Sequence, residues 1–222
     1  MKKYCISFFI IFLYLLTSCV SNKLSSSSVQ PAEIKEVSYF MPLSFVSLIE
    51  KGNRAIPSDS LSHIAKMVLD SVIRESSPFR VSGNLPVPDT INNRVDKEIA
   101  YLIQHIIRLK KIKGIKMPPI LDSVMKSNHQ RFALATIVTG FGRKQGNFGN
   151  QVAKGIGVGI LTLGMYAPVP VKSNNTLYGI ILVSDRNEII FYGKALPVEK
   201  SPTDRKVMEQ QYKKLFKGYL YD

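Results

Sequence analysis

One candidate strand, Phe132-Ala133-Leu134-Ala135-Thr136-Ile137-Val138, is apolar on both of its faces except at Thr136. Such a strand is buried on both sides, which is typical of the centre of a sheet covered by helices. Downstream, residues 176–184 and 188–196 are two further extended runs separated by Asp185-Arg186-Asn187, so they predict a β-hairpin. These three runs outline the sheet of an α/β domain.

Upstream of the central strand, amphipathic helices alternate with short extended segments. Ser58 is a candidate N-cap, after which apolar residues keep helical spacing from Leu61 to Ile73. The remaining helices are expected at 88–114, from Pro118 to about 126 and after Ser201, and the remaining strands at 37–40, 43–48 and 79–82. The pattern predicts an α/β (α+β) fold with a mixed β-sheet of about four to five strands flanked by three to four helices.

The N-terminus predicts export and lipidation. Lys2 and Lys3 precede an apolar run at 5–16, which has the length of a signal-peptide core and is too short to span a bilayer. The next residues, Leu16-Thr17-Ser18-Cys19, resemble the lipobox of bacterial lipoproteins of the Bacteroidetes type. This resemblance implies a signal peptide at 1–18, cleavage before Cys19 and a diacylglycerol on its sulfur, with further acyl chains such as palmitate.

Residues 19–35 are expected to be the lipidated N-terminus and a Ser-rich tether, followed by a single domain at 36–222. The second residue of the mature chain would be Val20 rather than Asp, which by resemblance to the enterobacterial sorting rule implies the outer membrane. No acidic cluster follows Cys19, so we expect the periplasmic face rather than surface display.

Residues 132–196 carry a second resemblance. A buried strand, a Gly-rich insert and a hairpin with Asp185 at its turn are similar to the small α/β domain shared by the amino-terminal part of TolB and the curli-secretion lipoprotein CsgG. The resemblance is one of topology and contains no catalytic motif. It implies a non-enzymatic lipoprotein domain.

The insert at 146–171 is apolar and rich in glycine. Its most apolar part, 152–171, includes Gly155, Gly157, Gly159 and Gly164, and carries one charge. The glycines suit either an extended chain or close helix packing, so the segment is expected to be buried or to face another subunit, which leaves a homo-oligomer open. The alternative follows from the CsgG resemblance: an oligomeric secretion or pore-forming lipoprotein that inserts 152–171 into the outer membrane. That family has a second insert after the final hairpin, for which the short stretch from Ala195 to Ser201 leaves no room.

The chain is basic, with 30 Lys+Arg against 16 Asp+Glu and a formal net charge of +14. A dense group of cations lies at the end of the second long helix: Arg108, Lys110, Lys111, Lys113 and Lys116. One interpretation is a solvated helix end that complements the helix dipole. The other is contact with anionic surfaces such as lipid A phosphates, phospholipid head groups or peptidoglycan carboxylates. An exported lipoprotein seldom meets nucleic acid, which is not expected as a partner.

Motifs for catalysis, metals or cofactors are missing from the sequence. His63, His105 and His129 lack metal-ligand spacing, and Cys5 and Cys19 are the only cysteines. Gly159 and Gly164 have the spacing of a phosphate-binding loop, but Met165 stands where its lysine is required. We therefore expect no enzyme, no metal and no cofactor, but a membrane-anchored interaction or assembly module of the cell envelope, with envelope proteins or peptidoglycan as partners.

Overall fold

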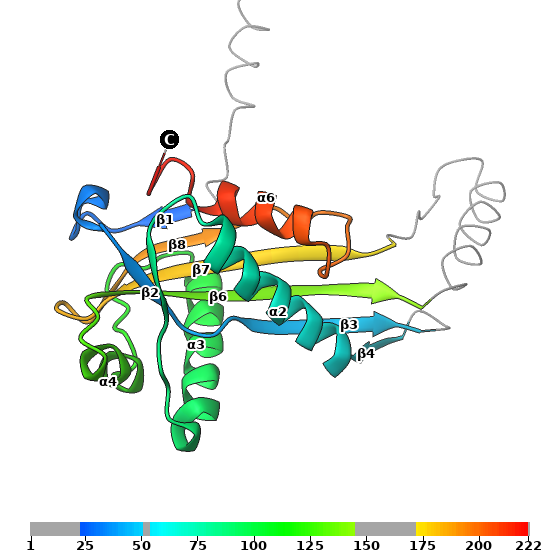
Figure 1. Cartoon of the computed structure of the whole chain (residues 1–222), viewed down its shortest axis with the longest axis horizontal. Helices are drawn as coiled ribbons and strands as arrows, with labels where there is room; N and C mark the ends of the chain where they lie inside the picture. Colours follow the sequence, from blue (N-terminus) through cyan, green and yellow to red (C-terminus); the bar gives the residue numbers. More distant parts are fainter. Residues whose placement is uncertain (1–22, 51–53, 145–171, 222) are drawn as a thin grey trace, which may run out of the picture.

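A computed structural model describes residues 23–50, 54–144 and 172–221 (Figure 1). The chain forms a mixed α/β fold, as the sequence predicts. Its strands are β1 (Lys23–Ser25), β2 (Val37–Tyr39), β3 (Leu43–Ile49), β4 (Ala55–Pro57), β5 (Val81–Asn84), β6 (Phe132–Arg143), β7 (Asn174–Val183) and β8 (Glu188–Lys194). Its helices are the 3-10 turn η1 (Pro31–Glu33) and α2 (Asp59–Ser76), α3 (Asp89–Leu109), α4 (Pro119–Ser127) and α6 (Arg205–Phe216).

The described strands form one sheet of eight, in which β6 is central. The order is β1-β8-β7-β6-β2-β5, while β3 continues the line of β2 and pairs with the outer part of β6. β6 runs parallel to β2 and β3 and antiparallel to β7, and β7 and β8 form the expected hairpin. The first seven residues of β6 are buried, which confirms a strand covered on both faces.

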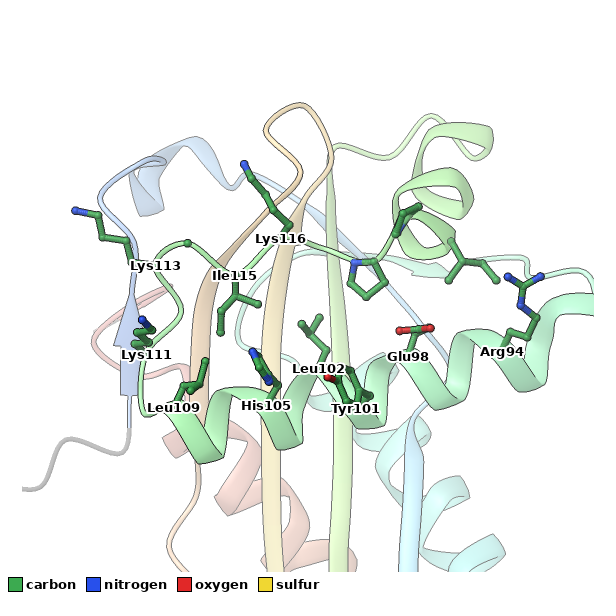
Figure 2. A pocket seen from close by; sticks show the side chains of 14 residues that line it. Arg94, Glu98, Tyr101, Leu102, His105, Leu109, Lys111, Lys113, Ile115 and Lys116 are labelled. Carbon is green, nitrogen blue, oxygen red and sulfur yellow. The ribbon is translucent and has the colours of Figure 1, made fainter.

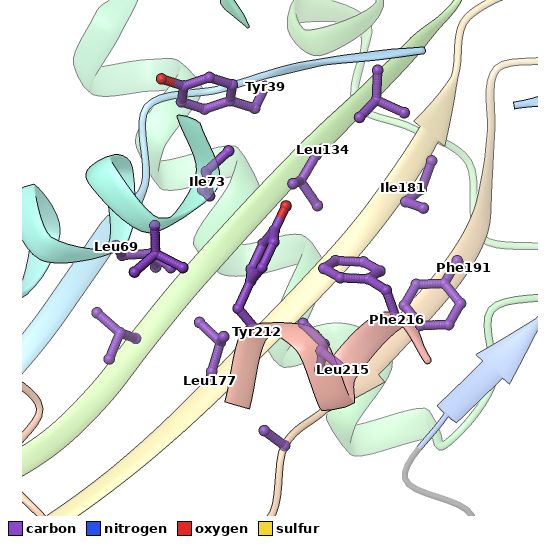
Figure 3. Packing of buried hydrophobic residues seen from close by; sticks show 14 of the residues in the cluster. Tyr39, Leu69, Ile73, Leu134, Leu177, Ile181, Phe191, Tyr212, Leu215 and Phe216 are labelled. Atoms are coloured by element: carbon purple, nitrogen blue, oxygen red, sulfur yellow. The ribbon is translucent and has the colours of Figure 1, made fainter. Parts of the chain in front are cut away.

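Helices cover both faces of the sheet, and each face has its own core. α2 and α6 pack on one face, where Tyr212 and Phe216 of α6 lie over Leu177, Ile181 and other sheet residues (Figure 3). α3 and α4 cover the opposite face through a second cluster of buried residues. Successive residues of β6, such as Ala133 and Leu134, belong to different clusters because successive side chains of a strand point to opposite faces.

The helices begin where local chemistry predicts. The Ser58 hydroxyl accepts from the backbone N–H of Leu61 at 3.4 Å, so Ser58 is the N-cap of α2. The last helix begins later than the expected start directly after Ser201: Asp204 is its N-cap and accepts from the N–H of Val207 at 3.2 Å. Ser201 instead bonds Thr203, within the turn that precedes the helix.

The chain joins the domain earlier than the Ser-rich composition suggests. The composition assigns residues 23–35 to the tether, but β1 pairs with β8, and the N–H of Ser26 donates to the carbonyl of Ile190 at 2.9 Å. Two apolar side chains fix this segment: Leu24 packs against the α3-side core and Val29 is buried in the α2-side core. With the short strands β1 and β4, the described sheet has eight strands, more than the four to five expected.

The predicted glycine-rich insert lies between two paired strands. β6 and β7 pair from Phe132↔Val183 out to Phe141↔Asn174, so residues 145–171 connect neighbouring antiparallel strands. The insert itself, with Gly155, Gly157, Gly159 and Gly164, lies outside the described residues, as do the signal peptide and Cys19.

Candidate functional site

The basic segment predicted at the end of the second long helix is the connection between α3 and α4. α3 ends at Lys110, which adopts the left-handed conformation (φ 52°) while its N–H donates to the carbonyl of Ile106. Gly114 follows with φ +82°, a conformation that side chains rarely adopt. Ile112 and Met117 are buried and anchor the connection, so the lysines between and beside them face solvent.

The connection folds back over α3 and encloses a cleft of about 690 Å³, which we call the cationic cleft (Figure 2). Leu102 and Ile115 lie between the helix and the connection, while Lys113 and Lys116 point outward at the rim. The cleft is lined by Arg94, Glu98, Tyr101, Leu102, His105, Leu109, Lys111, Lys113, Gly114, Ile115, Lys116, Pro118, Pro119 and Ile120.

Cations dominate the charge of the cationic cleft. Arg94 and three lysines face a single carboxylate, that of Glu98. Within the part of the chain that the structure describes, none of the three lysines, Lys111, Lys113 and Lys116, lies within 4 Å of a carboxylate oxygen. Their charges are therefore available to a ligand.

An aromatic pair stands on the α3 wall of the cleft. Tyr101 and His105 stack with ring centroids 5.8 Å apart and planes 19° from parallel. Nη2 of Arg108 lies 2.9 Å from Nδ1 of His105, and because a guanidinium can only donate, Nδ1 is the acceptor of this hydrogen bond. Arg108 thus fixes the orientation of the imidazole ring from outside the cleft lining.

A second cavity of about 300 Å³ lies on the other side of the same connection. Lys113 and Lys116 line it together with the serines at 25–28 of the N-terminal segment. The antiparallel bridge between Lys116 and Glu188 holds the connection beside β8. The two lysines are therefore shared by two cavities, one partly aromatic and one rich in hydroxyl groups.

The structure gathers only part of the predicted basic group. Lys111, Lys113 and Lys116 line the cleft, whereas Arg108 acts through His105 and the exposed Lys110 is the helix cap. On the opposite wall lie Arg94, Glu98 and Tyr101, which the sequence patterns do not single out, and His105, which is considered from the sequence only as a metal ligand. Their spacing of four, three and four residues along one helix face is the signal that could have revealed them.

Such an arrangement suits the binding of anions. Lysine ammonium groups are flexible point charges that attract phosphates and carboxylates, and an apolar floor beside them accepts an aliphatic or ring portion of a ligand. Among the described residues, no group of three or more His, Cys, Asp or Glu is placed to hold a metal ion. In the same residues, no helix combines the length and hydropathy required to cross a membrane.

Comparison with known proteins gives a remote likeness only. No family model and no curated protein matches the chain. Among solved structures, it is similar to a PelC dodecamer from Paraburkholderia phytofirmans, at 7% identity and a TM-score of 0.42, over 90% of this chain and 96% of that one. It is also similar to the LpoB C-terminal domain from Salmonella enterica, at 11% identity and a TM-score of 0.30, over 79% of this chain and 88% of that one. TM-scores this low carry no argument about function or assembly.

Proposed function

We propose that this chain is a bacterial lipoprotein, anchored through Cys19 at the periplasmic face of the outer membrane, whose α/β domain is a non-enzymatic interaction module of the cell envelope. The observation that carries the proposal is the lipobox at 16–19. It follows a signal-peptide core of the right length and directly precedes the folded domain, which begins at Lys23.

The cationic cleft supplies the interaction chemistry. Its three lysines lack carboxylate partners in the described structure, and the shared position of Lys113 and Lys116 gives an anionic ligand two adjoining cavities. Groups with this chemistry are abundant at the envelope: lipid phosphates, and the carboxylates of peptidoglycan and of acidic proteins. Since none of these ligands need be transformed, binding alone accounts for the site.

The anchor can be tested with the two cysteines of the chain. In cells, Cys19→Ser should abolish lipidation, leave the precursor uncleaved and change the mass of the protein accordingly. Cys5→Ser is the matched control, because Cys5 lies in the segment that is removed and its loss should leave lipidation intact. An intact amino terminus or an unmodified Cys19 in the native protein would overturn the proposal.

The non-enzymatic role has a separate test. Crosslinking of intact envelopes with the Cys19-anchored protein should recover a reproducible envelope partner or peptidoglycan, whereas the Cys19→Ser protein should not. Turnover of a cell-wall or phosphate-ester substrate by the purified protein, lost on a point mutation in the domain, would instead define an enzyme.

The second candidate function is an oligomeric secretion or pore-forming lipoprotein. One observation favours it: the insert joins β6 and β7, which are already paired as antiparallel strands where the chain leaves the sheet. An insert with that origin can continue the two strands as a hairpin. Ring-shaped oligomers in detergent, with a bilayer conductance lost on deleting residues 155–164, would support this function; a monomer that leaves bilayers sealed would exclude it.

A further inference from the structure

The outer edge of the sheet has a gap beside the junction of β2 and β3. β5 pairs with β2 as far as Tyr39↔Asn84, and β4 pairs with β3 only from Ser47↔Pro57 onward. Among the described residues, no strand therefore lies against 40–46 on this side. The gap corresponds to roughly 20 Å of extended chain, at about 3.3 Å per residue.

The backbone of Ser44 faces this gap. Val46, two residues on, uses its N–H and C=O outside the sheet, donating to the Ser62 hydroxyl at 3.0 Å and accepting from the Ser58 N–H at 2.9 Å. Because backbone groups two residues apart point to the same side of a strand, those of Ser44 also point outward. The Ser44 hydroxyl is buried with no hydrogen-bond partner in the described structure. The open edge beside Ser44 is therefore a place where another strand can pair with the sheet.

A groove runs along the gap, between α2 on one face of the sheet and α3 on the other. It consists of two adjoining cavities of about 590 and 340 Å³, and Lys66 of α2 and Asp96 of α3 line both of them. We call this the sheet-edge groove. Its floor is the segment at 40–45, which contains the start of β3, and its walls are the two helices.

Two exposed aromatic side chains line the groove. Phe45 is 55% exposed and Tyr101 is 60% exposed. Exposed apolar groups gathered at one place mark a contact surface rather than ordinary solvent-facing residues.

Asp96 provides a carboxylate that can form an ion pair or accept a hydrogen bond. It is half-buried and has no ion pair within 4 Å among the described residues. Burial raises the pKa of its carboxyl group, while the charge of Lys66 acts in the opposite direction. A basic side chain or an N–H group of a ligand would stabilise the ionised carboxylate.

We propose that the sheet-edge groove binds an extended segment of a partner protein, which adds a short strand to the open edge beside Ser44. The segment pairs its backbone with the outward N–H and C=O of Ser44, places an apolar side chain between Phe45 and Tyr101, and directs a basic or amide group to Asp96. This mode of recognition takes affinity from main-chain hydrogen bonds and specificity from side-chain pockets. The inference rests on the proposed role as an interaction module and names its docking site.

The test uses a displayed library of random peptides of about seven residues, a common strand length, selected on the detergent-solubilised full chain. Selected peptides should bind at least about tenfold more weakly to Phe45→Ala and to Tyr101→Ala, because each variant removes an exposed aromatic anchor. Ile107→Ala is the matched control: Ile107 is an exposed apolar residue of the same helix, 41% exposed and outside the groove lining.

A second measurement separates strand addition from simple hydrophobic adhesion. Methylation of the peptide nitrogen whose N–H faces the carbonyl of Ser44 should abolish binding. Methylation of the nitrogens on either side of it should leave binding unchanged, since only alternate N–H groups of a strand point to the same side. Equal sensitivity at all positions, binding unaffected by Phe45→Ala and Tyr101→Ala, or no peptide above background would each overturn the inference. So would sedimentation that showed self-association lost in Phe45→Ala, because the occupant would then be a second copy of this chain.

Failure here is distinguishable from failure of the proposed function. If envelope crosslinking of the anchored protein recovers the same partner with Phe45→Ala and Tyr101→Ala as with the native chain, the interaction module stands and the sheet-edge groove is not its docking site.

Discussion

The hydroxyl of Tyr39 donates a hydrogen bond of 2.7 Å to Oδ1 of Asp70, linking β2 to α2 inside the core. The other carboxylate oxygen, Oδ2, accepts from Nε of Arg74 at 3.0 Å. Asp70 is only 5% exposed, so each of its oxygens requires a partner in place of water. Burial, and then the bond to Asp70, hold the pKa of Tyr39 well above its usual value.

Removal of this hydroxyl should destabilise the fold. Tyr39→Phe keeps the ring in the core but leaves Oδ1 of Asp70 buried without its donor, so we expect the free energy of unfolding in urea to fall by about 1–3 kcal/mol. Tyr101→Phe is the control, because that side chain is exposed and should change stability by less than about 0.5 kcal/mol. Equal stability of the two variants would show that the Tyr39–Asp70 bond is not a stabilising contact.

Stability should decrease in alkali through buried tyrosines. Burial raises the pKa of Tyr192 and of Tyr219 to about 12, whereas a tyrosine in the unfolded chain titrates near 10. Below about pH 10 both states keep these protons, so stability is unaffected. Between about pH 10 and the folded-state pKa of about 12, the unfolded chain loses protons that the folded chain retains, and the free energy of unfolding should fall as the pH rises.

The alkaline effect is measured by urea unfolding across this pH range, with phenolate absorbance followed in parallel. Tyr192→Phe should reduce the dependence on pH. The difference in phenolate absorbance between the folded native chain and Tyr192→Phe reports ionisation of Tyr192. If that difference appeared near pH 10, it would contradict the expectation.

Two glycines of β6 provide a matched pair. A Cβ added at Gly140 would lie 2.1 Å from the backbone oxygen of Asn174, whereas one added at Gly142 would lie an ordinary 3.7 Å from Cδ1 of Leu61. Backbone cannot rotate away as a side chain can, so we expect Gly140→Ala to destabilise the protein by at least about 1–3 kcal/mol. Gly142→Ala should be nearly neutral in the same thermal or urea unfolding series. Similar losses of stability in both variants would show that the close approach of Gly140 to the backbone of Asn174 is not what destabilises the protein.

The cationic cleft should direct binding to anionic membranes. Replacement of Lys111, Lys113 and Lys116 by Gln should weaken binding to vesicles containing an anionic phospholipid by up to about 100-fold at low salt, at about 1 kcal/mol per lysine. The control replaces three exposed lysines outside the cleft, Lys35, Lys200 and Lys206. The difference in vesicle affinity between the native chain and the cleft variant should decrease at high salt, because salt screens the lysine charges. Equal losses in the two triple variants would mean that net charge, and not the cleft, attracts the lipid.

The central elements were predictable because their local signals agree with the tertiary structure. The two-faced apolar composition of β6 and the turn at Asp185-Arg186-Asn187 specify the middle of the sheet, and the apolar spacing of α2 and α3 specifies helices that each pack on one face. Ile64 and Leu109 keep the spacing of the apolar stripes of these helices, which would place both in the core, but they are 47% and 40% exposed.

The remaining features depend on neighbours that local sequence does not reveal. β1 has one apolar side chain in three residues, and it is a strand because β8 offers an open edge. Likewise, the lysine-rich segment is visible in the sequence, but the opposite wall at Arg94, Glu98 and Tyr101 is defined only once the connection folds back over α3. The sheet-edge groove arises because no described strand lies between β5 and β4, a feature for which no residue pattern exists.

The early start of β1 would limit how far a domain lipidated at Cys19 could move from the membrane. Lys23 is four residues beyond Cys19, and a fully stretched chain covers at most about 3.6 Å per residue. A lipid on Cys19 would thus keep the first strand within roughly 15 Å of the bilayer. Lys194 and Lys214 line a cavity together with Lys23, which would bring positive charge close to the phosphate layer. A domain tethered this closely could not diffuse into the periplasm, and any ligand would have to bind it at the membrane surface.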